Sequence, residues 1–208
     1  MEFIIALASG IELGIYLKIG LHSLSSKNDL VPDLFSDPIL YIFISAAFII
    51  PSILFDTLLE QIIACVFFFC LICISYTDTL TGLIFDRFNI LIAVIGISDL
   101  LRMFSITDLT DRLAGSLLGA GFLAVMDLFS YMILRKDGIG GGDIKLCCCA
   151  GFLLGSYGMF LTFVFAFLYA AVYVILSGKK GGETFPLGPF LCTAMAVVYC
   201  YAKTIMVK

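Results

Sequence analysis

Apolar runs that are long enough to cross a membrane recur along nearly the whole chain of 208 residues. A helical run of about 20 apolar residues spans the hydrocarbon core of a bilayer, and a helix satisfies its own backbone hydrogen bonds there. Charged residues make up 13% of the chain, against roughly 25% in soluble domains, while 62% of the residues are hydrophobic. We therefore predict an all-α, polytopic membrane helix bundle that forms a single domain over residues 1–208.

The sequence predicts eight apolar segments, or six to seven crossings if the short ones are re-entrant. The stretch from Ile144 to Leu176 is too long for one crossing, and Gly155-Ser156-Tyr157-Gly158 predicts a break within it. The first segment is interpreted as a retained span, since Glu2 stands where a signal peptide has basic residues. The segments are Phe3–Leu21, Ile39–Phe55, Gln61–Tyr76, Phe88–Phe104, Leu113–Leu134, Ile144–Leu154, Met159–Leu176 and Pro189–Ile205.

Lysine and arginine residues fall mainly in alternate loops of this arrangement, and loops rich in them face the cytoplasm. This orientation puts Asp78 and Asp143 on the cytoplasmic side, each at a membrane boundary. Lys203 and Lys208 are exceptions, because the last span places them on the opposite side. The net charge of −4 argues against a nucleic-acid partner and suits a basic one.

Charged side chains within apolar segments are costly and are candidates for function. Glu12 and Lys18 stand six residues apart, which is not the spacing of a local helical pair. Asp99 precedes Arg102 by three residues, which predicts a local ion pair. Asp127 lies deep in its helix, where it either bonds to a neighbouring helix or holds a proton. One hypothesis is therefore a small transporter or channel-like protein in which Asp127, Glu12 and Lys18 line a polar path.

Asp78 and Asp143 support a second hypothesis. Taken singly, each could cap a helix or lie in a loop. Two carboxylates at one membrane face can also hydrolyse a peptide bond. The ionised carboxylate takes a proton from water, and the protonated one polarises the carbonyl group.

Four glycines, Gly138, Gly140, Gly141 and Gly142, come just before Asp143. Without side chains, this backbone can take positive φ and can approach a substrate strand closely. A glycine loop that caps the next helix is the simpler interpretation. A dinucleotide site is excluded because no strand precedes the glycines, and a phosphate loop is excluded because no GK[ST] follows them.

The eight cysteines all fall within apolar stretches, and His22 is the only histidine. Cys70 and Cys73 lack the second pair or the histidine that a structural zinc site needs. We expect the cysteines to pack as small apolar residues, without a disulfide framework. The sequence thus predicts neither a metal site nor a cofactor.

The combined motifs resemble those of the type IV prepilin peptidases, a family of membrane aspartyl proteases. Gly140-Gly141-Gly142-Asp143 fits the GxGD motif, and Gly142-Asp143-Ile144-Lys145-Leu146, followed by Gly151, resembles the GDxKL…G signature. Asp78-Thr79-Leu80, ahead of Ile84, resembles the stretch around the first catalytic aspartate. Phe185-Pro186-Leu187-Gly188-Pro189-Phe190 resembles the PFGPF element. These stretches follow the family order over most of the chain.

The resemblance implies an endopeptidase that removes the short basic leader from prepilin-like proteins at the cytoplasmic face of a prokaryotic membrane. Asp78 and Asp143 would be the catalytic pair. The partners that the resemblance implies are the prepilin-like substrate and the lipid bilayer. Residues expected to position the loop or the substrate are Gly140, Gly141, Gly142 and Lys145, with Asp127, Pro186, Gly188 and Pro189 as secondary candidates.

The sequence also departs from the family pattern. Phe85 stands where the family has a proline, which affects the local turn. Many bacterial members carry a zinc domain between the first two spans, but the interval Ser23–Pro38 contains no cysteine. The chain therefore resembles the compact, peptidase-only members, and N-methyltransferase activity is not expected. A non-catalytic member that helps to assemble a pilus machine is a further alternative.

Overall fold

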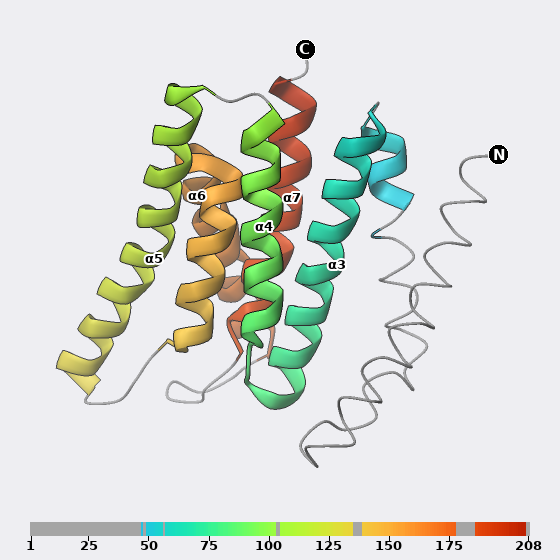
Figure 1. Cartoon of the computed structure of the whole chain (residues 1–208). Coiled ribbons are helices and arrows are strands. Elements are labelled where there is room, and N and C mark those ends of the chain that lie inside the picture. The colour runs from blue at the N-terminus through green and yellow to red at the C-terminus, as the bar shows by residue number, and fades with distance from the viewer. Residues whose placement is uncertain are drawn as a thin grey trace. The chain divides into compact units, whose positions relative to one another are not determined.

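The computed structural model describes residues 47, 49–55, 57–102, 105–134, 139–177 and 186–206. Within these ranges the chain consists of helices joined by short connections, without strands, which confirms the predicted helical bundle (Figure 1). The first expected span, the loop Ser23–Pro38, and the charges Glu12 and Lys18 lie outside the described residues. The helices are α3 (Leu58–Thr81), α4 (Asp86–Arg102), α5 (Ile106–Leu134), α6 (Gly141–Ser177) and α7 (Gly188–Met206).

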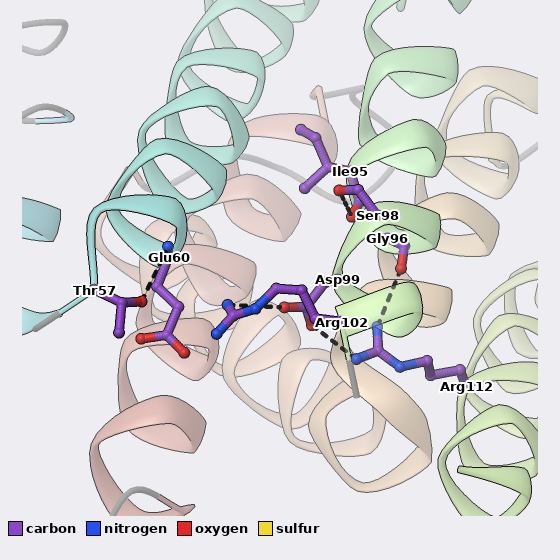
Figure 2. A network of polar contacts seen from close by, with 8 residues as sticks. All are labelled: Thr57, Glu60, Ile95, Gly96, Ser98, Asp99, Arg102 and Arg112. Carbon is purple, nitrogen blue, oxygen red and sulfur yellow. Dashed lines mark hydrogen bonds and ion pairs between the residues drawn. The ribbon is translucent and has the colours of Figure 1, made fainter. Parts of the chain in front are cut away.

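The chain divides into two compact units at the step from Phe69 to Cys70, inside α3. In the first unit, residues 49–54 are helical and α3 begins after Thr57. The hydroxyl oxygen of Thr57 accepts a hydrogen bond from the Glu60 N–H at 3.4 Å, as an N-cap residue does (Figure 2). The Gln61 side chain donates to the Phe55 carbonyl at 2.7 Å and ties the preceding turn to the helix.

Three helices in the described ranges are long and apolar enough to cross a membrane, namely Leu58–Thr81, Ile106–Ile133 and Gly141–Leu176. Gly188–Ala202 is a shorter apolar helix. Large apolar side chains are exposed along all these helices. Lipid can solvate such surfaces, so the chain is an integral membrane protein. The predicted total of eight segments stays a prediction.

In the second unit, α4, α5 and α7 each pack on α6. The contact between α5 and α6 is close enough to exclude side chains. A Cβ atom added to Gly115 would clash with the backbone of Gly151, and one added to Gly119 would clash with the Cys147 carbonyl. Small residues that bring two backbones together are a typical feature of helix pairs in membranes.

Gly155 interrupts α6 with φ 74° and ψ 177°, a conformation that other residues rarely adopt. Before this residue α6 runs antiparallel to α5, since Gly115 meets Gly151 and Gly119 meets Cys147. After it, Phe163 packs on Phe122 with 4.7 Å between ring centroids. A straight helix would carry Phe163 away from Phe122, so the second half of α6 must turn back (Figure 1).

The predicted break is therefore confirmed, but the reversal needs a single residue instead of a four-residue loop. Ser156, Tyr157 and Gly158 already belong to the second half of α6. The Asp111 carboxylate of α5 accepts hydrogen bonds from the Ser156 N–H, at 3.2 Å, and from its hydroxyl group. Asp111 thus caps the start of the second half.

Candidate active site

Asp78 lies in the last turn of α3, where its backbone carbonyl accepts the Gly82 N–H at 2.9 Å. Gly82 has φ 64°, the left-handed conformation that commonly ends a helix. The Asp78 side chain is only 6% exposed. Its Oδ2 atom accepts the N–H of Gly188, the first residue of α7, at 3.0 Å. The start of a helix has free N–H groups and a partial positive charge, so it stabilises this carboxylate.

Gly188 is packed directly against the Asp78 carboxyl group. A Cβ atom at Gly188 would lie 2.5 Å from Oδ2 and 2.9 Å from Cγ of Asp78. The neighbouring Leu187 carbonyl accepts the N–H groups of Phe190 and Leu191, both at 3.1 Å, and so begins α7. Pro189 fits in this first turn because its missing N–H would have no helical partner there. The described part of the PFGPF-like element, residues 186–190, thus forms a helix start that holds Asp78.

Asp143 is the third residue of α6 and is 7% exposed. Its N–H donates to the Gly140 carbonyl at 3.0 Å, and its carboxylate accepts the Gly140 N–H in return. Asp143 is thus the N3 residue of α6, and its carboxylate pairs with the N–H of the N-cap residue Gly140, as the N3 side chain of a capping box does. The Oδ1 atom of Asp143 is buried and has no hydrogen-bond partner within the described ranges.

Asp78 and Asp143 interact electrostatically with each other. Cys192, one turn into α7, lies close to both of them. The fold thus brings the two aspartates together beside the starts of α6 and α7, although they are far apart in the sequence. The sequence pattern did not single out Cys192, because its only signal was its position four residues after Gly188.

The glycines before Asp143 do not use the positive φ that glycine permits. Among the described glycines, positive φ occurs only at Gly82 and Gly155, and not at Gly140, Gly141 or Gly142. Gly142 instead permits close packing, since a Cβ atom there would lie 2.9 Å from the Cβ of Ile84. A Cβ atom at Gly141 would meet nothing within 4 Å.

Lys145 fixes the start of α6 to the start of α4. Its Nζ atom lies 2.9 Å from Oδ2 and 3.0 Å from Oδ1 of Asp86. Both side chains are more than half exposed, so the pair contributes only about 0–1 kcal/mol. The turn before α4 forms without the family's proline, and the Phe85 carbonyl accepts the Phe88 N–H at 3.1 Å.

The other two acids within apolar helices, Asp127 and Asp99, have polar partners. Asp127 is partly exposed, and its Oδ1 atom accepts the Ile139 N–H at 3.0 Å. Asp127 thus makes a polar contact, but its partner lies in the connection before α6 and not on a neighbouring helix. Asp99 lies 4.0 Å from Arg102, as predicted, but its shorter contact is to Arg112 of α5, at 2.7 Å (Figure 2). The sequence missed Arg112 because the partner comes from another helix. These contacts do not support a polar path.

The cysteines of α3, α6 and α7 are free thiols. Within the described part of the chain, no three His, Cys, Asp or Glu side chains form a group that could hold a metal ion. The Cys147-Cys148-Cys149 run is part of the first half of α6, and Cys147 is fully buried there. The cysteines near the aspartates therefore pack as small side chains between helices.

Comparison with known proteins gives one family and three relatives. The model of the type IV leader peptidase family matches residues 65–175. The chain is 32% identical over 160 residues to a prepilin leader peptidase/N-methyltransferase of Bacillus subtilis (strain 168), covering 74% of this chain and 62% of the relative. It is 27% identical over 146 residues to a protein of the same name from Dichelobacter nodosus, covering 68% and 49%.

The third relative, leader peptidase HopD of Escherichia coli, is 35% identical over 96 residues, covering 43% of this chain and 61% of HopD. The chain thus spans about half to three fifths of the length of these curated relatives. No solved structure matches the chain significantly.

Proposed function

Because the chain belongs to the type IV leader peptidase family, we propose that it is a membrane aspartyl endopeptidase that removes the short basic leader from prepilin-like proteins. The observation that carries this proposal is the buried pair of interacting carboxylates, Asp78 and Asp143, beside the starts of two helices. Both aspartates lie within the residues that match the family. The proposed site of action is the cytoplasmic face of a prokaryotic membrane.

The surroundings of the two carboxylates suggest different roles for them. Two buried carboxylates that interact cannot both be ionised comfortably, so the pair shares a proton. The N-terminus of α7 donates a hydrogen bond to Asp78, which favours the ionised form of this residue. Asp143 also accepts a backbone N–H, from Gly140, but its Oδ1 atom has no hydrogen-bond partner within the described ranges and so leaves a position for the shared proton.

In the proposed reaction, Asp78 takes a proton from a water molecule as the water oxygen attacks the carbonyl carbon of the scissile bond. Protonated Asp143 donates a hydrogen bond to the carbonyl oxygen and stabilises the negative charge that develops there. The C–N bond then breaks, and the departing amine takes the proton from Asp78. The products are a free carboxyl group on the leader and a new amino terminus on the shortened protein.

The proposal is limited to peptidase activity. The names of two relatives include N-methyltransferase, but this chain spans only 62% and 49% of those proteins. The basic leader of the substrate suits the net charge of −4 of this chain. The bilayer is the second partner, because the substrate must present its bond at the membrane boundary.

The test is co-expression with a prepilin-like substrate, with leader removal followed by mass spectrometry. Asp78→Asn and Asp143→Asn should each reduce cleavage to background, because either change removes one of the two proton-transfer groups. Asp108→Asn makes the same chemical change at an exposed position of α5 and should cleave like the wild type. Normal cleavage by both Asp78→Asn and Asp143→Asn would exclude the aspartyl mechanism.

A further inference from the structure

Asn89 has a buried amide group that the proposed mechanism does not use. The residue lies in the first turn of α4 and is 3% exposed. Neither its amide nitrogen nor its amide oxygen has a hydrogen-bond partner within the described ranges. Buried polar groups are nearly always paired, so an amide with neither atom paired calls for an explanation.

Asn89 lies on the face of α4 that packs against α6. The buried residues of α4 form one stripe, which comprises Asn89, Ile92, Ile95, Gly96, Asp99 and Leu100. Gly96 in this stripe is packed against α6, since a Cβ atom there would lie 3.0 Å from the ring of Phe152. The amide of Asn89 therefore belongs to the helix interface and not to the outer surface.

The register between α4 and the first half of α6 gives the depth of Asn89. The two segments run parallel, because Ile84 packs on Gly142, Asp86 pairs with Lys145, and Gly96 meets Phe152. By the same register, Asn89 stands level with Leu146 and Cys147. At 1.5 Å per residue, this level is about 5 Å along the helix axis from Asp143.

The side chains at the level of Asn89 form the layer next to the aspartate pair. Cys147 lies close to Asp143 and to Cys192, and Cys192 lies close to both aspartates. Cys147 belongs to α6 and Cys192 to α7, so both helices contribute small apolar side chains to this layer. On α4, the residue at this depth is Asn89, an unpaired amide one helical turn from the reacting groups.

We infer that Asn89 is a substrate-positioning residue whose side-chain amide pairs with the peptide backbone of the substrate beside the scissile bond. This inference rests on the proposed peptidase function. A cleaved bond must be in unwound backbone, and unwound backbone near a membrane has N–H and C=O groups without partners. A carboxamide supplies one acceptor and two donors in a single plane, and so matches both backbone groups.

Access to Asn89 requires the substrate to part α4 from α6 at their starts. These starts are held together by the packing of Ile84 on Gly142 and, at the surface, by the half-exposed pair of Asp86 and Lys145. Exposed ion pairs of this kind are weak, so an entering peptide can separate them. Asn89 then becomes available one turn further in.

The test compares Asn89→Leu with the wild type and with Ile92→Leu, using a prepilin-like substrate. Leucine has a similar size and removes both polar atoms, whereas Ile92→Leu changes the next residue of the same stripe. We expect Asn89→Leu to raise KM about tenfold, as the loss of one or two backbone hydrogen bonds implies. Its thermal midpoint should equal or exceed that of the wild type, because the resting protein loses no hydrogen bond. Ile92→Leu should keep the wild-type KM.

Binding provides the second measurement. In the Asp143→Asn background, which does not cleave, Asn89→Leu should weaken binding of the uncut substrate by a similar factor. Unchanged KM and binding would overturn the inference. An activity loss that tracks a fall in thermal midpoint, or a failure to fold, would overturn it too, because either result shows a structural role. A wild-type protein that cleaves no prepilin-like substrate would instead overturn the proposed function.

Discussion

Replacing Gly188 with alanine tests whether the start of α7 positions the Asp78 carboxylate for the proposed reaction. The added methyl group would lie 2.5 Å from Oδ2, 2.9 Å from Cγ and 3.1 Å from Cβ of Asp78. Two of these distances are below 3.0 Å, which real Cβ atoms essentially never show. The Asp78 carboxyl group must therefore move by roughly 0.5–1 Å, and its 3.0 Å hydrogen bond from Gly188 breaks or lengthens.

Two magnitudes follow from this displacement. A reacting group that is misplaced by about 1 Å loses on the order of a hundredfold in rate. The cost in folding free energy is smaller, about 1–3 kcal/mol, because the crowded atoms belong to one side chain that can turn and not to backbone. Gly188→Ala should therefore cleave about a hundredfold more slowly while it still folds.

The assay is single-turnover leader removal in detergent with enzyme in excess, so that the rate reports the chemical step. Thermal unfolding of the same samples gives the stability. Gly121→Ala is the matched control, since a Cβ atom at Gly121 of α5 meets nothing within 4 Å. A wild-type rate for Gly188→Ala would refute the reasoning. A rate that falls only in proportion to the folded fraction would refute it too.

The remaining predictions concern three other glycines. Gly142→Ala should destabilise the fold by about 1–3 kcal/mol and slow cleavage, because its methyl group would lie 2.9 Å from the Ile84 side chain; a thermal midpoint equal to that of the wild type would contradict this packing. Gly141→Ala should keep the wild-type thermal midpoint, because its methyl group meets nothing within 4 Å, but it should slow cleavage if the substrate lies against this glycine. An unchanged rate would count against a substrate that lies there. Gly155→Ala should lower the free energy of unfolding by at least about 2 kcal/mol, because alanine disfavours φ 74° and its Cβ would clash with Asp111. Unchanged thermal stability would contradict the single-residue reversal.

The sequence predicted the helices well because hydrophobic length is a local property. The expected segments Gln61–Tyr76, Phe88–Phe104 and Leu113–Leu134 correspond to α3, α4 and α5, with ends that differ by up to seven residues. The break inside Ile144–Leu176 was also predictable, since no single helix of that length fits a bilayer. That the break needs only one residue was not predictable, because it depends on the capping of Ser156 by Asp111 from another helix.

The candidate site was predictable only in part. The motif resemblance selected Asp78 and Asp143, and the structure brings them into interaction. The role of the glycines was not fixed by the sequence, because a glycine can serve either positive φ or close approach. Gly142 and Gly188 serve close approach, against Ile84 and Asp78.

Pairings between helices carried no sequence signal at all. Arg112 stands thirteen residues after Asp99 and Lys145 stands fifty-nine residues after Asp86, and no local spacing rule covers either separation. Asn89 reads as an ordinary polar residue in the first turn of a helix. Its burial and its unpaired amide appear only when α4 is packed on α6.

The reversal at Gly155 is as necessary to the site as the motif residues. A straight helix over the 37 residues of α6 would place Ser177 about 54 Å from Gly141. The chain between Ser177 and Gly188 can reach at most about 40 Å when fully extended. Gly188 could then not return to donate its hydrogen bond to Asp78, whose partner Asp143 stands at the start of α6. Because the second half of α6 turns back, the end of α6 and the start of α7 lie at the same end as Asp143. The glycine of the break, with no chemical role of its own, thus makes the contact between α7 and the aspartate pair possible.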